Sequence, residues 1–210
     1  TSGGGCRIRI TKATDPRPRI SLPKGRLPNI ELRMVTQKHS AIWNEYIHRY
    51  HYLGYKPLPG AQLRYLVFAN DQLLALLGFS AAAWMTAPRD KFIGWNDLQR
   101  KSNLHLVVNN SRFLILPWVQ MKNLASKILA TSAKRLVSDW NIRYGYQPVL
   151  LETFVETGKF RGTSYKAANW IFVGKTQGRG KLGGHDTKIP KKDIWIYPLT
   201  NDFRQRLNNE

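Results

Sequence analysis

Cysteine, acidic residues and long apolar runs are scarce in this sequence of 210 residues. The single cysteine, Cys6, excludes a framework of internal disulfide bonds and is typical of proteins in a reducing cytoplasm. No apolar run approaches the ~20 residues that a membrane-spanning helix needs. The small, polar residues 1–5 also differ from a secretory signal. We therefore expect a cytoplasmic protein that has no membrane partner.

The shortage of acidic residues leaves a large excess of positive charge. The 33 Lys and Arg against 13 Asp and Glu give a formal net charge of +20 and a pI near 10.4. No fold needs such an excess, because like charges repel one another in the compact state. The excess therefore predicts a polyanionic partner. We expect DNA, and RNA would satisfy the same charge.

The positive charge is concentrated in two segments. Residues 1–35 hold eight basic and two acidic residues, residues 36–156 hold fourteen and seven, and residues 157–192 hold nine and one. The middle of the chain thus resembles an ordinary globular surface. This distribution predicts a binding face that is built from the two ends of the chain.

Proline content and hydrophobicity suggest how the chain is divided. Four prolines interrupt residues 1–35, which we expect to form an extended basic arm. The arm is either a disordered leader or a strap that crosses the fold and contacts phosphate. Hydrophobic residues make up 42% of the chain, enough for one well-packed domain. We place that domain at residues 36–200 and a C-terminal tail at residues 201–210.

Apolar periodicity and turn residues predict the order of the elements. We expect helices over 36–50, 123–140 and 164–169, and strands over 62–69, 72–80, 104–108, 112–116, 148–155, 170–174 and 194–199. Residues 84–95 are expected to be irregular or a short helix. Asn70-Asp71 suits a tight hairpin turn between the first two strands. This order predicts an α/β fold with a mixed sheet and crossover helices.

Part of this pattern resembles the GNAT acyltransferase fold, over about residues 62–175. A strand leads through Pro117 into the long helix, and a strand–helix–strand unit follows over 148–174. In GNAT enzymes a glycine-rich loop at the start of that helix binds the pyrophosphate of coenzyme A. The corresponding loop here, residues 118–126, has no glycine. We therefore expect a GNAT-like fold that does not bind coenzyme A.

A closer resemblance is carried by short motifs that occur in the same order along residues 36–199. These motifs are His51-Tyr52-Leu53-Gly54, Arg89-Asp90, Ile93-Gly94-Trp95, Asn110-Ser111-Arg112-Phe113, Leu124-Ala125-Ser126, Asp139-Trp140, Leu151-Glu152-Thr153, Gly162-Thr163-Ser164-Tyr165, Ala168-Asn169-Trp170 and Gly178-Arg179-Gly180. They resemble the DruA family, which is named for the Druantia anti-phage systems and has relatives in bacterial mobile elements. The resemblance implies a role in DNA defence or DNA mobility, with other proteins of such systems as further partners.

Glu152 is an acidic residue in a strand that is otherwise apolar or β-branched. Burying a carboxylate is costly unless it is paired, protonated or bound to a metal. Glu152 is therefore either paired with an arginine, such as Arg161 or Arg112, or acts as a general base or metal ligand. In the second case Asp90 and His51 would complete a catalytic cluster, with Asp90 and Glu152 binding Mg²⁺ or Mn²⁺. No Cys/His spacing is typical of zinc.

Tyr165 is the second candidate for chemistry. It begins a short helix and lies between Arg161 and Lys166, whose charges would favour a phenolate. It could attack a phosphodiester or donate a hydrogen bond, as the tyrosine that protonates the leaving thiolate does in GNAT enzymes. It could instead be a core residue that packs on Trp170.

Basic residues around these candidates are expected to bind phosphate, with Trp170 stacking on a base. The predicted nucleic-acid-binding residues are Arg89, Arg112, Lys159, Arg161, Lys166, Lys175, Arg179, Lys181 and Trp170. A solvated basic loop is the alternative. Taken together, the sequence predicts a nucleic-acid-binding protein that cleaves or transfers DNA strands, as a nuclease or transposase does. The alternatives are a non-catalytic DNA-binding module and a GNAT-type acyltransferase.

Overall fold

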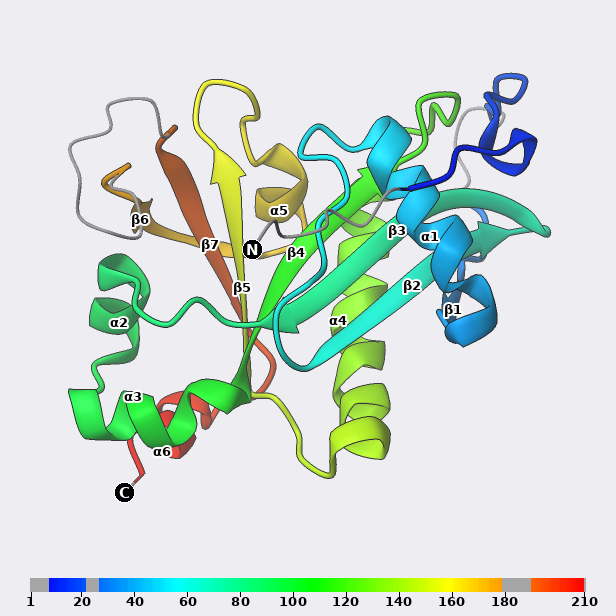
Figure 1. The fold of residues 1–210 in the computed structure, drawn as a ribbon. Helices are drawn as coiled ribbons and strands as arrows, with labels where there is room; N and C mark the ends of the chain where they lie inside the picture. Colours follow the sequence, from blue (N-terminus) through cyan, green and yellow to red (C-terminus); the bar gives the residue numbers. More distant parts are fainter. Residues whose placement is uncertain (1–7, 22–26, 179–189, 210) are drawn as a thin grey trace, which may run out of the picture.

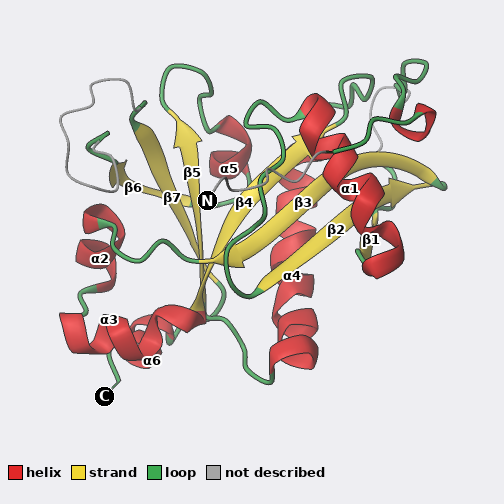
Figure 2. Ribbon diagram, viewed as in Figure 1, coloured by secondary structure: helices red, strands yellow, loops and turns green. Residues whose placement is uncertain are grey.

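The computed structural model describes residues 8–21, 27–178 and 190–209, which form one mixed sheet flanked by helices (Figures 1 and 2). The strands are β1 (Glu31–Met34), β2 (Gln62–Ala69), β3 (Gln72–Ala81), β4 (Val107–Ile115), β5 (Leu150–Glu156), β6 (Ile171–Lys175) and β7 (Lys192–Pro198). The helices are α1 (Gln37–Tyr50), α2 (Ala87–Ile93), α3 (Asp97–Asn103), α4 (Leu124–Tyr144), α5 (Thr163–Ala167) and α6 (Phe203–Leu207), with 3₁₀ turns at Lys12–Thr14 and Leu104–Leu106. The predicted α/β fold with a mixed sheet is thereby confirmed.

The seven strands follow the order β1-β2-β3-β4-β5-β7-β6. All neighbours are antiparallel except β4 and β5, which are parallel. The long helix α4 connects these two parallel strands, as a crossover requires. The β2–β3 hairpin turns at Asn70 and Asp71, as predicted, and both residues have left-handed backbones with φ of 46° and 59°.

Helices α1 and α4 cover opposite faces of the sheet. Neighbouring residues of a strand point to opposite faces, and Arg64 and Tyr65 of β2 show which helix lies on each. The guanidinium of Arg64 donates to Asn44 of α1 at 2.9 Å, whereas the hydroxyl of Tyr65 donates to Asp139 of α4 at 3.0 Å. The core between these layers contains Trp43 and Trp140, both almost completely buried.

The strand predicted over 104–108, with 112–116 continuing it after Asn109-Asn110, is observed as β4, which begins only at Val107. It runs without a break, and its register against β3 shifts so that Ser111 is an extra residue between the pairs Phe79–Asn110 and Gly78–Arg112. Such a bulge bends a strand and redirects its side chains. The asparagine pair thus forms part of a bulged strand, although the same residues in sequence are typical of a turn.

The parallel pairing of β4 with β5 extends over only three residues, Val107–Asn109 against Leu150–Glu152. Beyond these residues the two strands diverge, which is visible at the upper edge of the sheet in Figure 1. Strand β5 continues along β7 instead, from Leu150 to Glu156. The bulge in β4 lies at the start of this divergence, and the two strands leave a space between them that side chains from other elements line.

The predicted domain boundaries are too narrow at both ends. Strand β1 pairs with β2, so the domain begins before residue 36. The predicted tail 201–210 contains α6, whose Phe203 and Leu207 are buried against Ile93, Trp95 and Val107. Both segments complete the apolar packing of the sheet, which explains why they are ordered elements of the domain. No helix among the described residues is long and apolar enough to cross a membrane.

Arg89 forms a buried ion pair with Glu152 beneath the diverging strands. One guanidinium nitrogen lies 2.8 Å from Glu152 Oε2, and both side chains are completely buried. The backbone amide of Ala83 donates to Glu152 Oε1 at 2.8 Å, and Asp90 also binds Arg89 at 2.8 Å. Removing one partner of such a pair leaves an uncompensated buried charge. The pair therefore ties helix α2 to strand β5.

We expect Glu152→Gln to destabilise the protein by about 3–5 kcal/mol, the usual cost of breaking a buried ion pair from one side. The measurement is the free energy of unfolding in urea. Asp97→Asn is the matched control, because Asp97 pairs with Arg100 at 2.9 Å with 81% of its side chain exposed; its effect should stay below about 1 kcal/mol. Wild-type stability of Glu152→Gln would contradict a structural role for the pair.

Candidate functional site

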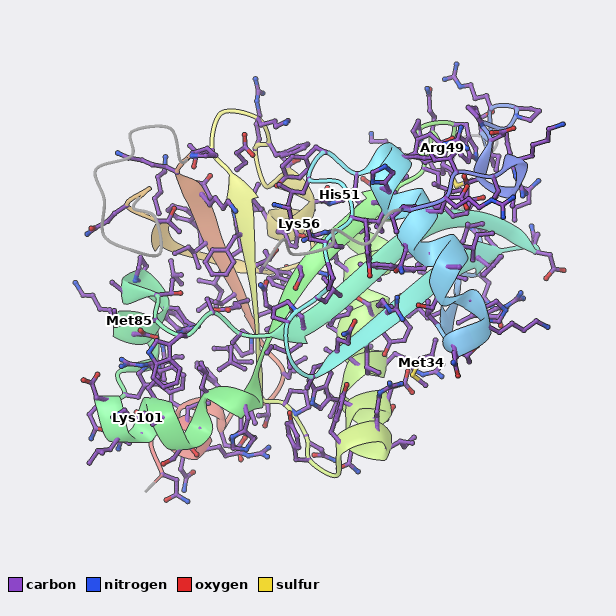
Figure 3. The ribbon with its side chains drawn as sticks, viewed as in Figure 1. Met34, Arg49, His51, Lys56, Met85 and Lys101 are labelled. Carbon is purple, nitrogen blue, oxygen red and sulfur yellow. The ribbon has the colours of Figure 1, made fainter. Side chains whose placement is uncertain are left out.

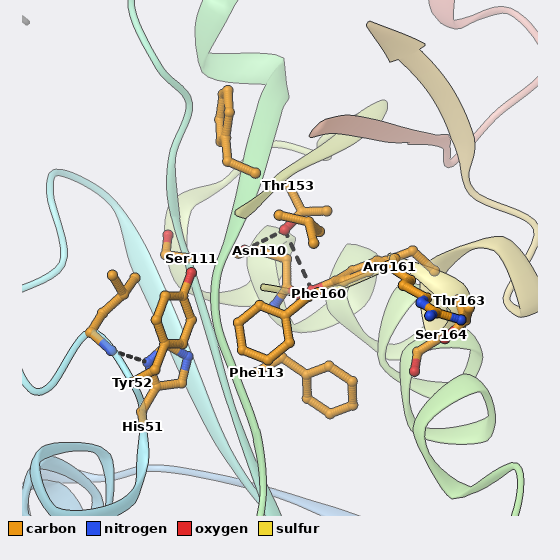
Figure 4. A pocket seen from close by; sticks show the side chains of 15 residues that line it. His51, Tyr52, Asn110, Ser111, Phe113, Thr153, Phe160, Arg161, Thr163 and Ser164 are labelled. Atoms are coloured by element: carbon orange, nitrogen blue, oxygen red, sulfur yellow. Dashed lines mark hydrogen bonds between the residues drawn. The ribbon is translucent and has the colours of Figure 1, made fainter. Parts of the chain in front are cut away.

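A pocket of about 250 Å³ opens where β4 and β5 diverge (Figure 4). Four segments line it: residues 51–53 after α1, Asn110, Ser111 and Phe113 of β4, residues 153–155 of β5, and residues 160–165 leading into α5. Its walls carry the aromatic rings of Tyr52, Phe113, Phe160 and Tyr165, together with several hydroxyl and amide groups. Among the described residues that line it, none is acidic.

Hydrogen bonds join the two strands at the inner end of the pocket. The hydroxyl of Tyr165 donates to Asn110 Oδ1 at 2.8 Å, and the hydroxyl of Thr153 donates to the Asn110 carbonyl at 3.0 Å and to the Tyr165 oxygen at 3.4 Å. Asn110 Nδ2 in turn donates to the carbonyls of Gly78 and Arg112. The backbone carbonyls of Asn110 and Arg112 thus have donors within the chain, so this edge of β4 is already satisfied.

Tyr165 is held as a neutral phenol in this arrangement. Burial raises its pKa to about 12, because the phenolate would lose its hydration, and the hydrogen bond from Thr153 offsets only part of this effect. Tyr165 also packs edge-on against Trp170, with ring centroids 5.0 Å apart. Of the roles predicted for this residue, the hydrogen-bond donor and the packing residue fit these contacts, and the phenolate nucleophile does not.

Gly162 positions the turn that brings the α5 side chains to the pocket. Its backbone is left-handed, with φ of 66°, and a Cβ atom there would lie 2.8 Å from the indole of Trp195. Both the conformation and the space therefore require glycine. This residue allows Thr163, Ser164 and Tyr165 to face the space beside β5.

His51 enters the pocket from the C-terminal end of α1. Its Nδ1 accepts a hydrogen bond from the backbone amide of Leu53 at 3.2 Å, so the neutral ring carries its proton on Nε2. Burial lowers its pKa to about 4, and the nearby charge of Arg112 acts in the same direction. His51 is therefore an uncharged group at neutral pH, and it stacks on Tyr52 with centroids 4.9 Å apart.

Two cationic side chains, Arg161 and Lys159, lie at the pocket. The guanidinium of Arg161 lines it, and Lys159 Nζ lies 4.6 Å from the centre of the Tyr52 ring. Lys166 is exposed on α5, whereas Arg112 is half-buried and donates to the Ser111 carbonyl at 2.7 Å. The structure thus brings four predicted residues to the pocket, namely His51, Lys159, Arg161 and Tyr165, and Arg112 lies close enough to His51 to affect its pKa.

The predicted catalytic acids lie elsewhere. Glu152 is on the other side of β5 from Thr153 and binds Arg89, not the predicted Arg161 or Arg112. The predicted cluster of Asp90, Glu152 and His51 is wrong, because the carboxylates bind Arg89 and His51 lines the pocket. This pairing also opposes a role for Glu152 as a base. Arg89, predicted to bind nucleic acid, is completely buried and cannot reach phosphate.

The same pairing decides the metal prediction. Asp90 and Glu152 both direct their oxygens at the Arg89 guanidinium, which occupies the position that Mg²⁺ or Mn²⁺ would need. In the described part of the chain, no three His, Cys, Asp or Glu side chains gather closely enough to hold a metal ion. These residues therefore do not fit a metal centre.

The remaining predicted residues are dispersed. Trp170 is only 4% exposed and packs between Tyr165 and Tyr197, so the prediction that it stacks on a base is wrong. Lys175 lies at the end of β6, with Nζ 3.7 Å from Asp193. Arg179 and Lys181 lie outside the described residues.

Several pocket residues were not predicted. Asn110 and Ser111 lay between the predicted strand stretches 104–108 and 112–116, and neither they nor Phe113 and Phe160 had an assigned role. Their sequence signal is weak, because polar or aromatic residues at strand ends occur for many reasons. Only the divergence of β4 from β5 brings these residues together, and that divergence follows from a register that sequence periodicity does not specify.

The loop before α4 is engaged by the N-terminal segment. Ile20 forms a parallel β-bridge with Val119, so that its amide donates to the Trp118 carbonyl at 2.8 Å and its carbonyl accepts from the Gln120 amide at 3.0 Å. The Val119 and Leu124 amides bind carbonyls of their own loop. These contacts occupy the amides of Val119, Gln120 and Leu124, so fewer backbone donors remain near the start of α4 for an anion such as pyrophosphate.

We expect stability to rise with pH between about 4 and 6.5 through His51, whose pKa is lowered from 6.5 to about 4 on folding. Within this window the unfolded chain binds the proton more tightly, so protonation favours unfolding. Urea unfolding at several pH values should show a smaller pH dependence for His51→Gln than for the wild type. The exposed His105 supplies the control, and an equal effect of His105→Gln would contradict the assignment to His51.

Comparisons with known proteins agree with this architecture. The spermidine/spermine N-acetyltransferase SpeG from Vibrio cholerae superposes with a TM-score of 0.53 at 12% identity, covering 84% of this chain and 96% of its own. A GNAT-family acetyltransferase from Streptococcus pneumoniae superposes with a TM-score of 0.51 at 12% identity, covering 82% and 100%. These superpositions confirm the GNAT-like fold. At such low sequence identity they show the fold alone. No curated protein matches this chain in sequence.

The sequence motifs identify the family more narrowly than the fold does. Residues 12–187 match the family described as Druantia protein DruA. This stretch contains the bulged strand β4, the pocket and helix α5, and it confirms the resemblance seen in the sequence. The chain therefore belongs to the DruA family.

Proposed function

We propose that this protein binds nucleic acid and that an unpaired nucleotide enters the pocket between β4 and β5. The observation that carries the proposal is the composition of the pocket, in which aromatic walls and a cationic mouth occur without an acidic lining residue. Membership of a defence family is compatible with a nucleic-acid partner. The net charge of +20 supports the same partner.

The cationic mouth supplies the sequence-independent part of the binding. Arg161 lines the pocket, and Lys159 lies over the ring of the lining residue Tyr52. Both are exposed, as is Lys166 on α5. Each phosphate that such a cation neutralises releases counterions, which makes binding favourable and dependent on salt. Glu156 at the end of β5 is an acid close enough to raise the pKa of Tyr52.

The aromatic walls suit a base that has left its stack. Tyr52 and Phe160 lie with ring centroids 4.9 Å apart, and both are exposed at the mouth. Bases stack on such rings with little regard to sequence, because every base has a π-face. A base that is paired and stacked in a duplex cannot enter the pocket between β4 and β5 of the protein. The proposed ligand is therefore single-stranded nucleic acid or a nucleotide that is flipped out of a duplex.

Strand cleavage is less well supported than binding. A phosphoryl-transfer site needs a nucleophile or a metal, but Tyr165 is a neutral phenol bonded to Asn110, and the acids at Asp90 and Glu152 bind Arg89. Acyl transfer, which the fold relatives carry out, meets a different obstacle. The amides of Val119, Gln120 and Leu124 and the carbonyls of Asn110 and Arg112 are already bonded within the chain.

We expect single-stranded DNA to bind more tightly than a duplex of the same length, with an affinity that falls as salt rises.

Tyr52→Ala should weaken binding by about 1–3 kcal/mol, the usual contribution of one stacked base. Arg161→Gln should lower the salt slope by about 0.7, as expected for one lost phosphate contact. Fluorescence anisotropy with labelled oligonucleotides measures both quantities. Unchanged affinity in both variants would overturn the proposal, and tight binding of acetyl-coenzyme A by titration calorimetry would favour acyl transfer.

A separate prediction concerns Tyr165. We expect Tyr165→Phe to lose about 1–3 kcal/mol of stability, because the buried Asn110 oxygen loses its donor, while binding of single-stranded DNA is retained. Urea unfolding and anisotropy measure the two effects. Incubation of labelled DNA with Mg²⁺ or Mn²⁺ adds the test of chemistry: a covalent adduct formed by the wild type and absent from the variant would establish Tyr165 as a nucleophile.

A further inference from the structure

The N-terminal residues 8–21, which we call the strap, are fixed to the domain although they contain little regular structure. The carboxylate of Glu45 on α1 accepts hydrogen bonds from the Thr11 amide at 2.6 Å and from the Thr14 hydroxyl at 2.6 Å. Glu45 is only 5% exposed. Arg49, one turn further along the helix, donates to Thr14 Oγ1 and to Asp15 Oδ1, each at 2.9 Å.

Two further contacts complete this attachment. The hydroxyl of Tyr50 donates to the Thr14 carbonyl at 2.7 Å, and Ile20 forms the bridge to Val119. Burial raises the pKa of Glu45, but the hydrogen bonds from Thr14 and Thr11 and the charge of Arg49 outweigh burial and lower it. The strap is therefore held by an ionised carboxylate at neutral pH, and its exposed side chains have defined positions on the surface.

The outward side of the strap is cationic. Arg9, Lys12, Arg17 and Arg19 are all exposed, and within the described part of the chain none of them forms an ion pair. The strap has one acidic residue, Asp15, and it is bound to Arg49. Four cations thus remain available to an external anion.

The strap and the pocket are adjoining parts of one surface. Arg49 and Tyr50 bind the strap, and the next two residues, His51 and Tyr52, line the pocket. Figure 3 shows Arg49 and His51 at the same end of α1. Tyr52 in turn contacts Phe160 and Lys159 on the far side of the pocket mouth. A continuous line of contacts therefore runs from the strap across the end of α1 to the pocket.

From this arrangement we propose that the strap extends the nucleic-acid site, binding the phosphates of the strand that leaves the pocket across the C-terminal turn of α1. The proposal rests on the function proposed above and adds a direction to it. When one nucleotide of a nucleic-acid strand occupies the pocket, the strand on one side of that nucleotide passes Lys159 or Arg161. The strand on its other side passes the strap cations. Strand length then decides whether the strap contributes to binding.

The test compares single-stranded oligonucleotides of about 4 and about 16 nucleotides, which span the usual range of single-strand sites. Replacing Arg17 and Arg19 by Gln together should leave binding of the short strand unchanged. For the long strand it should lower the salt slope by about 1.4, which is about 0.7 for each lost phosphate contact. The matched control replaces Lys91 and Lys101, which are exposed on α2 and α3, and Lys101 lies far from His51 in Figure 3.

Glu45→Gln tests whether the fixed position of the strap matters for binding in addition to its charge. The variant weakens the attachment of the strap to α1 but keeps all four strap cations. We expect it to weaken binding of the long strand and not of the short one. Equal loss for the control pair and the strap pair would overturn the proposal in favour of general charge. If the strap variants bind both strands like the wild type while Arg161→Gln binds them more weakly, the strap inference fails and the pocket proposal stands. If no oligonucleotide binds the wild type, both fail.

Discussion

The parting of β4 from β5 after three paired residues is the constraint on which the site depends. Parallel strands that stay paired leave no room for side chains from other elements between them. Here the extra residue Ser111 bends β4, and Asn110, Thr153 and Tyr165 bond to one another at the point of divergence. These bonds satisfy the freed backbone carbonyls, which would otherwise be costly to bury. The pocket is thus closed by polar contacts where Asn110, Thr153 and Tyr165 meet, and it is open to solvent at Tyr52 and Phe160.

The buried pair of Arg89 and Glu152 shows how a structural group can resemble a catalytic one in sequence. A carboxylate in an apolar strand must be neutralised by something, and that requirement was predicted correctly from the sequence. Its partner was not, because Arg89 lies 63 positions away on α2. The pair leaves Arg89 and Glu152 no free charge for a ligand. The separate motifs Arg89-Asp90 and Leu151-Glu152-Thr153 therefore have a structural explanation here.

Long, strongly periodic elements were the part of the fold that sequence could predict. Helix α4 and the β2–β3 hairpin follow from spacing and from Asn70-Asp71. The errors arose where polar residues have an unusual function. Asn109 and Asn110 are typical of turns, yet here they continue a strand because the Asn110 side chain bonds across the bulge. The short helix α6 was missed because two apolar residues, Phe203 and Leu207, carry its packing.

The bridge between Ile20 and Val119 joins positions that are 99 residues apart. During synthesis the N-terminal residues leave the ribosome long before their partner has been made. The contacts of Thr11, Thr14 and Asp15 with α1 can form once residue 50 has emerged, but Ile20 lacks its partner until β4 and the loop that follows it are made. The segment is therefore fixed in two stages, and its second attachment, at Val119, requires that β1 to β4 have already been synthesised.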